Sequence, residues 1–259
     1  MRLRVASIQL RIGDETKSER IRRAEALLDE AKGAHLAVLP EIWNVGYFTF
    51  DRYAAESEPL DGETATRMSA KAKEHGFYLH MGSMVERDGE RLYNTSLLFD
   101  PSGNRVARYR KIHLYGFGSK EAQILTRGDE VVVVSTPVGK IGLCTCYDLR
   151  FPELFRAMLD RGVELFLVAS GWPYPRLEHW LMFNRIRAIE NSAFLISSNG
   201  VGINRGVQFC GHSMVVDPWG VIVASGGDEE CILKTEIDLE QVSAVRNCFP
   251  AVRDRILST

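Results

Sequence analysis

A cysteine, Cys146, stands where a predicted β-strand ends and a predicted helix is about to begin. Apolar runs at 131–134 and 138–143 predict strand, and the apolar spacing over 154–159 predicts helix, with Pro152 in its first turn. A thiol at such a junction can lie exposed beside free backbone N–H groups, which suits a nucleophile that generates an oxyanion. Most free cysteines are buried packing residues, and position alone leaves that alternative open.

A carboxylate and an ammonium follow predicted strands in the same manner. Glu41 comes just after the apolar run 37–39, and Lys111 comes just after the strand that ends near residue 109. If the three strands are neighbours, the ammonium favours the thiolate and the carboxylate accepts the thiol proton. Taken singly, Glu41 is more typical of a solvated loop acid, and Lys111 of a basic rim with Arg108 and Arg110.

Composition restricts the class of protein. The chain has 259 residues, 45% of them hydrophobic and 25% charged, with a formal net charge of −2. This balance argues against nucleic-acid and membrane-surface partners, which need a basic patch. No apolar run is long enough for a membrane span, and residues 1–5 lack the apolar core of a signal peptide. We therefore expect a cytoplasmic protein.

Five cysteines and six histidines show neither Cys-x-x-Cys nor His-x-x-x-His spacing. A disulfide framework and a structural zinc site are both disfavoured by that pattern. No linker rich in glycine, serine or charge divides the chain, so residues 1–259 are interpreted as one domain.

Alternating strands and helices must position the three candidate residues. Hydrophobic periodicity predicts strands at 3–10, 35–39, 77–85, 92–99, 105–109, 164–169, 193–198, 213–216, 221–224 and 231–237. It predicts helices at 14–32, 64–75 and 176–191 in addition to the one after Cys146, and turn residues predict hairpins at 100–104 and 217–220. Apolar strands need cover on both faces, which implies an α/β layered sandwich.

The sequence resembles the nitrilase superfamily of carbon–nitrogen hydrolases in motifs that occur in the family's order. They are Leu39–Glu41 with Gly46–Tyr47, Tyr109–Leu114, Cys146–Glu153, Gly211–Ser213 and Val216–Gly220. The resemblance implies a four-layer α-β-β-α sandwich with two mixed sheets and outer helices. It also implies Glu41, Lys111 and Cys146 as a catalytic triad, and a homodimer or higher homo-oligomer formed through the outer helices.

The same resemblance assigns further roles. Cys146, directly before Tyr-Asp, takes the nucleophile position, and Cys144 is interpreted as packing. Glu121 lies seven residues before Gly128, the relation of a fourth catalytic glutamate in the family. The elbow residues Asp148, Arg150 and Glu153 are expected to brace the turn through charge pairs rather than touch substrate.

The implied reaction is amide hydrolysis through a thioester on Cys146. Lys111 and the backbone N–H of Tyr147 are expected to stabilise the oxyanion, and Glu41 to move the protons. Glu121 would hold Lys111 and the amide nitrogen in register. The reaction requires neither a metal nor an organic cofactor.

The segment Trp172–Trp180, with Arg187–Asn191 after it, looks like the ω-amidase subgroup, whose members act on 2-oxoglutaramate and related 2-oxo-acid amides. An acidic substrate needs a cationic contact, and Arg176 is the candidate. Trp172, Tyr47 and Tyr115 are candidates for the pocket wall, with ordinary loop packing as the alternative.

Other functions stay open. Within the superfamily the substrate could instead be an N-carbamoyl compound, an aliphatic amide or deaminated glutathione, whereas nitrile hydrolysis usually accompanies Cys-Trp-Glu rather than Cys146-Tyr-Asp. A catalytically silent ligand-binding member is an alternative of another class. A generic Cys–His hydrolase would use His113 or His212 as base, although a packing or bracing role is preferred for both.

Overall fold

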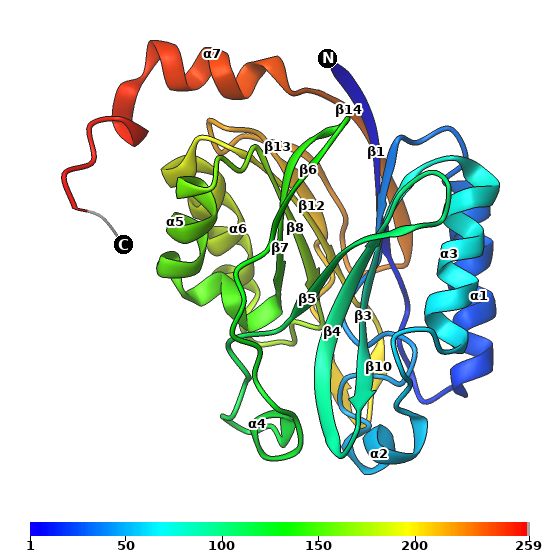
Figure 1. Ribbon diagram of the computed structural model, residues 1–259. Helices are drawn as coiled ribbons and strands as arrows, with labels where there is room; N and C mark the ends of the chain where they lie inside the picture. Colours follow the sequence, from blue (N-terminus) through cyan, green and yellow to red (C-terminus); the bar gives the residue numbers. More distant parts are fainter. Residues whose placement is uncertain (258–259) are drawn as a thin grey trace.

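Two six-stranded sheets lie face to face in the computed structural model, which describes residues 1–257 (Figure 1). The first sheet has the order β14 (Cys231–Asp238), β1 (Arg2–Gln9), β2 (Leu36–Val38), β3 (Tyr78–Asp88), β4 (Arg91–Phe99), β5 (Arg105–Arg110). The second has the order β13 (Ile222–Ser225), β12 (Met214–Val216), β9 (Phe194–Asn199), β8 (Leu165–Ser170), β7 (Gly139–Thr145), β6 (Val133–Thr136). Both sheets are mixed, with parallel central pairs and antiparallel flanks.

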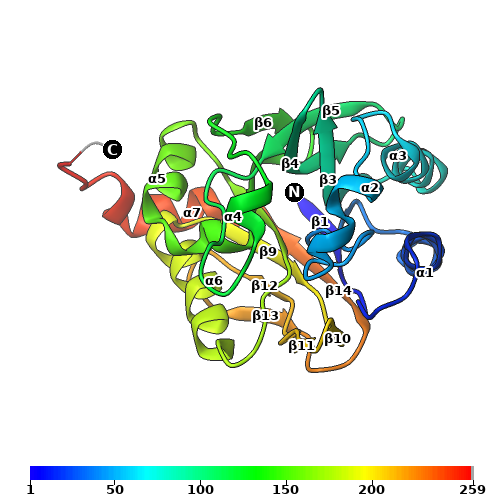
Figure 2. The same ribbon diagram turned by 90° about the horizontal axis from the view of Figure 1, so that it is seen from below.

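Helices cover the outer face of each sheet, so that the layers run α-β-β-α. The helices α1 (Lys17–Glu30) and α3 (Glu63–His75) lie on the first sheet, and α5 (Pro152–Asp160) and α6 (Leu177–Asn191) on the second (Figure 2). The α/β sandwich predicted from the sequence is confirmed. Among residues 1–257, no helix combines the length and the apolarity that crossing a bilayer requires.

Three apolar cores hold these layers together. One lies between the sheets and includes Val5, Leu98, Leu143 and Leu167, while the other two lie between each sheet and its helices. The strands β2 and β8 each contribute to the core between the sheets and to one core beneath the helices. They are therefore buried on both faces and read as continuous apolar runs rather than as alternating patterns.

Local sequence signals set the ends of the helices. Thr16 and Glu19 form a capping box at the start of α1, and Gly76 ends α3 in the left-handed conformation. In the hairpin between β4 and β5, Asp100 accepts hydrogen bonds from the backbone N–H groups of Ser102 and Asn104.

Several boundaries differ from the sequence-based expectation. The apolar runs at 131–143 form an antiparallel hairpin, β6 and β7, around the Thr136–Gly139 turn. The helix expected at 14–32 begins only after the Thr16 cap. Short elements without a clear periodic signal were missed: α2 (Tyr53–Glu56), α4 (Glu121–Ile124), β10 (Ile203–Asn204), β11 (Val207–Gln208) and α7 (Glu240–Cys248).

Candidate active site

Cys146 sits on a sharp turn at the end of β7. It is the first residue of a short 3-10 helix, η2 (Cys146–Arg150), and its backbone is left-handed with φ of 47°. A non-glycine residue rarely adopts this conformation, and such strain concentrates at functional sites. The turn leaves the thiol 7% exposed, and the next residue, Tyr147, lies where helix N–H groups lack intrahelical acceptors.

Asp148 holds this turn in place from below. Its carboxylate accepts hydrogen bonds from the backbone N–H of Thr145 (2.8 Å), the hydroxyl of Tyr109 (2.6 Å) and the backbone N–H of His113 (3.1 Å). The His113 ring also contacts Asp148 at 2.8 Å and stacks on Phe151. The bracing roles expected for Asp148 and His113 agree with these contacts.

The expectation of charge pairs was wrong for two neighbours of Asp148. Glu153 is exposed in the first turn of α5 and forms no ion pair within the described part of the chain. Arg150 turns the other way, toward the pocket, where its guanidinium lies over the Trp172 ring and donates to His179 Nδ1 at 3.2 Å. The reason is geometric, since the two residues lie two positions apart in η2, which is about two thirds of a 3-10 turn and places their side chains on different faces.

The second histidine proposed as a base, His212, has its ring against the carbonyl oxygen of Cys210 at 2.7 Å. Cys144 lies fully buried in the core beneath α5 and α6, with its thiol 3.6 Å from the Leu167 carbonyl. These contacts agree with the packing roles preferred for both residues.

Lys111 and two glutamates form a fully buried charge cluster beside the thiol. Lys111 Nζ donates to Glu41 Oε1 at 2.8 Å and to both carboxylate oxygens of Glu121 at 3.0 Å. All three side chains have zero exposure. Glu41 also accepts from the Gly171 backbone N–H at 2.9 Å, which fixes the rotation of its carboxyl group.

Two glycines allow the strand ends that carry these charges to come close to their neighbours. Gly82 has φ of 70°, and a Cβ there would lie 1.9 Å from the carbonyl oxygen of Pro40, directly before Glu41. A Cβ on Gly128 would lie 2.1 Å from the Arg110 carbonyl oxygen, directly before Lys111. Glycine is the residue that permits such approaches.

Glu121 begins α4 rather than lying in an irregular loop, and it joins the cluster to the pocket wall. Its carboxylate accepts from the hydroxyl of Tyr47 at 3.0 Å and from the backbone N–H of Tyr115 at 2.8 Å. The residue that the resemblance placed fourth thus lies with Glu41, Lys111 and Cys146 in one site.

Electrostatics set the resting charges of the cluster. Burial raises the pKa of Cys146 well above its usual value, and the Glu41 charge adds to this, while Lys111 acts in the opposite direction. Burial also raises the pKa of Glu41, against the Lys111 ammonium. Burial lowers the pKa of Lys111, but Glu121 and Glu41 outweigh it and the net shift is upward. Cys146 therefore rests as a neutral thiol, because burial and the Glu41 charge outweigh the effect of Lys111, which acts toward the thiolate as expected.

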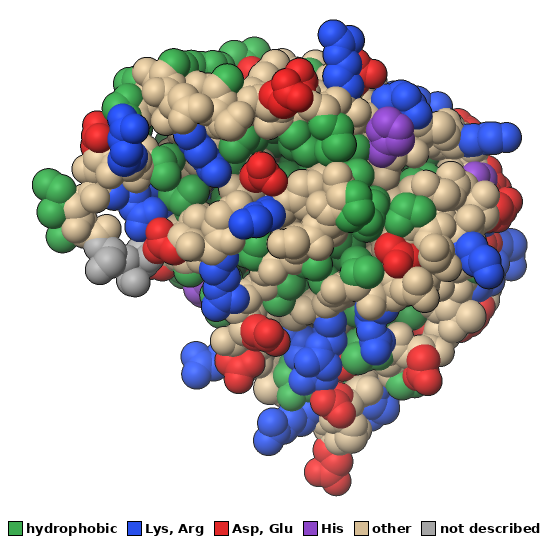
Figure 3. All heavy atoms as spheres, turned by 45° about the horizontal axis from the view of Figure 1, so that its top comes forward, with side chains coloured by type: hydrophobic (Ala, Val, Ile, Leu, Met, Phe, Trp, Pro, Cys, Tyr) green, Lys and Arg blue, Asp and Glu red, His purple; other side chains and the backbone are tan. Residues whose placement is uncertain are grey.

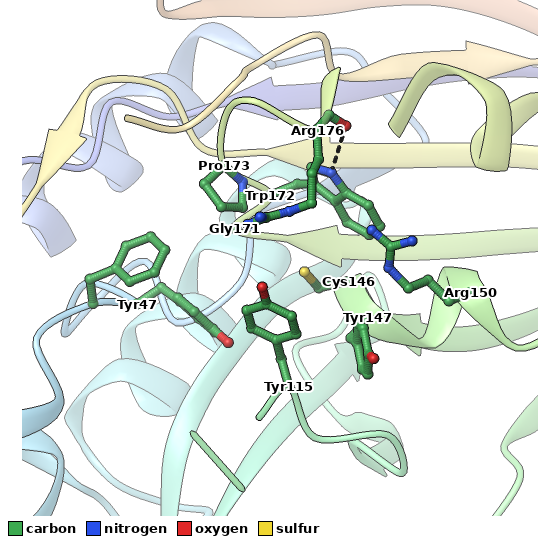
Figure 4. Close-up of a pocket in the computed structure, with 10 residues that line it drawn as sticks. Tyr47, Tyr115, Cys146, Tyr147, Arg150, Gly171, Trp172, Pro173 and Arg176 are labelled. Atoms are coloured by element: carbon green, nitrogen blue, oxygen red, sulfur yellow. Dashed lines mark hydrogen bonds between the residues drawn. The ribbon is translucent and has the colours of Figure 1, made fainter. Parts of the chain in front are cut away.

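A pocket opens above the thiol (Figure 4). Aromatic and cationic side chains from four segments form it: Tyr47, Phe48, Tyr115, Cys146, Tyr147, Arg150, Trp172 and Arg176, with Gly171 and Pro173. The four candidates for the pocket wall, Tyr47, Tyr115, Trp172 and Arg176, all line it. Trp172 Nε1 donates to the Arg176 carbonyl at 3.0 Å, which ties the loop to the start of α6.

Sequence reasoning missed two residues of this site. Arg150 was assigned to the elbow, and Asn94, which touches both glutamates, was assigned no role. A signal for Asn94 was present, since the polar run Asn94-Thr95-Ser96 interrupts an otherwise apolar strand.

A metal-binding geometry occurs elsewhere on the surface. The ligand atoms of Asp29, Glu74 and His75 lie within 4.8 Å of one another. Lys71 Nζ already contacts Asp29 at 2.5 Å and Glu74 at 2.9 Å, so an ammonium occupies the position of a cation. This cluster lies on α1 and α3, away from the thiol.

Comparison with known proteins agrees with the geometry. The family model for carbon–nitrogen hydrolases matches residues 4–247. The 2-oxoglutaramate amidase of Paenarthrobacter nicotinovorans is 36% identical over 98% of this chain and 89% of its own.

Two solved structures have the same fold. XC1258 from Xanthomonas campestris, a CN-hydrolase superfamily protein with an arsenic adduct in its active site, superposes with a TM-score of 0.93 at 28% identity, covering 100% of this chain and 99% of its own. A mutant of the amidase from Nesterenkonia sp. AN1, carrying the product of Michael addition of acrylamide at its active site cysteine, gives a TM-score of 0.85 at 26% identity, covering 97% and 99%. The chain belongs to the carbon–nitrogen hydrolase family and is an enzyme that hydrolyses amides.

Proposed function

We propose that this amidase hydrolyses the terminal amide of small 2-oxo acids such as 2-oxoglutaramate, with Cys146, Glu41, Lys111 and Glu121 as catalytic residues. The observation that carries the proposal is a thiol at the base of a pocket that holds two arginines, with a buried lysine and two glutamates beside it. The 2-oxoglutaramate amidases of Bacillus subtilis and Paenarthrobacter nicotinovorans are each 36% identical to this chain, which supports the substrate class.

In the first half of the reaction, Glu41 takes the Cys146 proton as the sulfur attacks the amide carbonyl. A neutral thiol next to a buried carboxylate is arranged for this coupled transfer, because a free thiolate would be desolvated. The resulting oxyanion lies between the Lys111 ammonium and the Tyr147 backbone N–H, each donor worth about 3 kcal/mol in typical oxyanion holes. The C–N bond then breaks, ammonia leaves with the proton from Glu41, and a thioester remains.

In the second half, a water molecule replaces ammonia. Glu41 takes a proton from the water as its oxygen attacks the thioester carbonyl, the C–S bond breaks, and the proton returns to the Cys146 sulfur. The products are the free thiol and a carboxylic acid. Glu121 keeps its place throughout, holding Lys111 and the Tyr115 backbone.

Arg176 and Arg150 suit the substrate's carboxylate. Both line the pocket, and neither forms an ion pair with a carboxylate of the described chain. The Arg150 guanidinium carbon lies 4.8–5.8 Å from the centres of the Trp172, Phe183 and Tyr147 rings, and one of its N–H groups donates to His179, which leaves further N–H groups for an anion. The Tyr47 hydroxyl is already bound to Glu121, so its contribution to the substrate is its ring.

The test is a steady-state screen of ammonia release. We expect turnover of 2-oxoglutaramate, much weaker turnover of N-carbamoyl amino acids and neutral aliphatic amides, and none by C146A. Mass spectrometry of a rapidly quenched reaction should show an acyl adduct on the Cys146 peptide. Preference for an N-carbamoyl compound or deaminated glutathione would refute the substrate, and ammonia release by C146A would refute the mechanism.

We further propose a single-domain, cytoplasmic enzyme that forms a homodimer. Exposed apolar side chains on and beside α6 favour self-association: Met182, Ile186, Ile189, Trp219 and Phe249. On the face drawn in Figure 3, basic and acidic side chains are interspersed, which disfavours a nucleic-acid partner. Light scattering after size-exclusion chromatography tests the assembly, with a monomer at micromolar concentration as the contrary result.

A further inference from the structure

A buried asparagine, Asn94, connects the two glutamates of the cluster. It lies in β4 with zero exposure, and its Nδ2 donates to Glu41 Oε1 at 2.8 Å and to Glu121 Oε1 at 2.9 Å. Its backbone carbonyl accepts from the Lys111 backbone N–H at 2.8 Å. One residue therefore contacts all three charged members of the cluster, yet it is absent from the pocket wall.

The chemistry of the neighbours fixes the orientation of this amide. Ionised carboxylates only accept hydrogen bonds, so the two N–H groups must face them and the oxygen must point away. Asn94 Oδ1 has no partner among residues 1–257. A buried acceptor without a partner lowers stability, and this orientation of Asn94 leaves Oδ1 unpaired while both N–H groups face the carboxylates.

The charge count shows why a neutral donor is needed. Glu41 and Glu121 are two buried carboxylates with one ammonium, Lys111, between them. The same oxygen of each carboxylate accepts from both Lys111 Nζ and Asn94 Nδ2. Asn94 thus bridges the Glu41 and Glu121 carboxylates a second time, as a neutral donor, so no second cation is needed between them.

We propose that Asn94 is a positioning residue that clamps the Glu41 carboxylate, together with Glu121, in the place from which Glu41 accepts the Cys146 proton. This inference rests on the proposed function for the role of Glu41 as base. Without the two N–H donors of Asn94, Glu41 and Cys146 hold their shared proton more tightly, and Glu41 no longer acts as a base at neutral pH.

The experiment uses Asn94→Asp, which keeps the shape, replaces both N–H donors by an acceptor oxygen and adds a third carboxyl group beside Glu41 and Glu121, and Asn94→Ser, which removes a donor without adding a charge. Other titratable groups face the cluster and are unchanged in both variants: Glu41, Glu121, Lys111, Cys146, Tyr47 and Tyr53. The rate at which iodoacetamide alkylates Cys146, followed by mass spectrometry of its peptide, reports the shared proton without any natural substrate. We expect the pH of half-maximal rate to rise by at least one unit in Asn94→Asp.

Turnover gives the second readout. Because Asn94 lines no part of the pocket, kcat for 2-oxoglutaramate should fall at least 100-fold in Asn94→Asp while KM changes less than threefold. Asn94→Ser, which keeps one donor, should give intermediate values in both assays and serves if the aspartate variant does not fold.

The matched control is Asn184→Asp on α6. Asn184 is equally buried, its Nδ2 donates to the Trp180 carbonyl, its Oδ1 is also unpaired, and neither atom touches a carboxylate. The control should leave the pH of half-maximal alkylation unchanged. An unshifted pH in folded Asn94→Asp and Asn94→Ser, or an equal shift in Asn184→Asp, would overturn the proposal. A wild-type enzyme that hydrolyses none of the amides, while Asn94→Asp still shifts alkylation, would refute the proposed function and support the clamp.

Discussion

His80 offers a direct test of how this fold responds to acid. It lies on β3 with zero exposure, and neither ring nitrogen has a hydrogen-bond partner among residues 1–257. Burial lowers its pKa from 6.5 to about 3. Between these two values the unfolded chain binds a proton that the folded chain cannot bind.

The magnitude follows from this difference. Because the unfolded state takes up the proton, stability is full above about pH 6.5 and declines as the pH falls toward 3. At pH 5, about 1.5 units below the unfolded-state pKa, protonation stabilises the unfolded chain by about 1.36 kcal/mol per unit. The free energy of unfolding is therefore about 2 kcal/mol lower than at pH 7.5. His80→Leu removes that loss and also removes a buried unpaired N–H, worth about 1–3 kcal/mol at every pH.

Urea unfolding of the wild type and His80→Leu at pH 7.5 and 5.0 checks the prediction. The variant should be more stable at both pH values, and its advantage should grow by about 2 kcal/mol at pH 5.0, since other titrating groups cancel in the difference. Met84→Leu, a buried apolar exchange on the same strand, should show no such growth. An advantage that is equal at the two pH values, or a variant less stable than the wild type, would refute the reasoning.

Three further predictions concern the site. Glu41→Gln removes a charge that adds to burial in raising the pKa of Cys146, so alkylation of the thiol should reach its half-maximal rate at lower pH, while ammonia release falls by about 100-fold or more. An alkylation profile displaced to higher pH would contradict this sign. Arg176→Gln should raise KM for 2-oxoglutaramate by about tenfold, equivalent to about 1.4 kcal/mol, and leave KM for a neutral aliphatic amide unchanged in the same assay. Asp148→Asn removes the charge and replaces one of two acceptor oxygens by an NH2 group that faces N–H or O–H donors, so its free energy of unfolding should fall by about 2–3 kcal/mol. A change below 0.5 kcal/mol, about the level of a surface substitution, would show that the elbow does not depend on the carboxylate.

Much of the fold was predictable because its strands carry strong local signals. The parallel strands β2 and β8 are buried on both faces, so residues 36–38 and 165–169 read as unbroken apolar runs. The missed elements are short and depend on tertiary contacts: α4 is a single turn whose first residue is held by the buried cluster.

The candidate pocket was predictable only where a motif carried it. Tyr47, Trp172 and Arg176 lie in segments that resemble the family, Tyr115 directly follows one, and the structure places all four around the thiol. Arg150 was missed because residues four apart in a tight turn point in directions that spacing alone does not reveal.

The sequence by itself determined which residues can react: a thiol, an ammonium and two carboxylates, three of them just after predicted strands, in an order shared with one family. Only the tertiary structure decided their protonation and their partners. Glu41 contacts Asn94, 53 residues away in the sequence, and Lys111, 70 residues away. Burial and the charge of Glu41 keep Cys146 a thiol at rest, rather than the thiolate that a nearby lysine alone would favour. The physical reason is that desolvation and charge coupling depend on distance in space, which the order of residues along the chain does not specify.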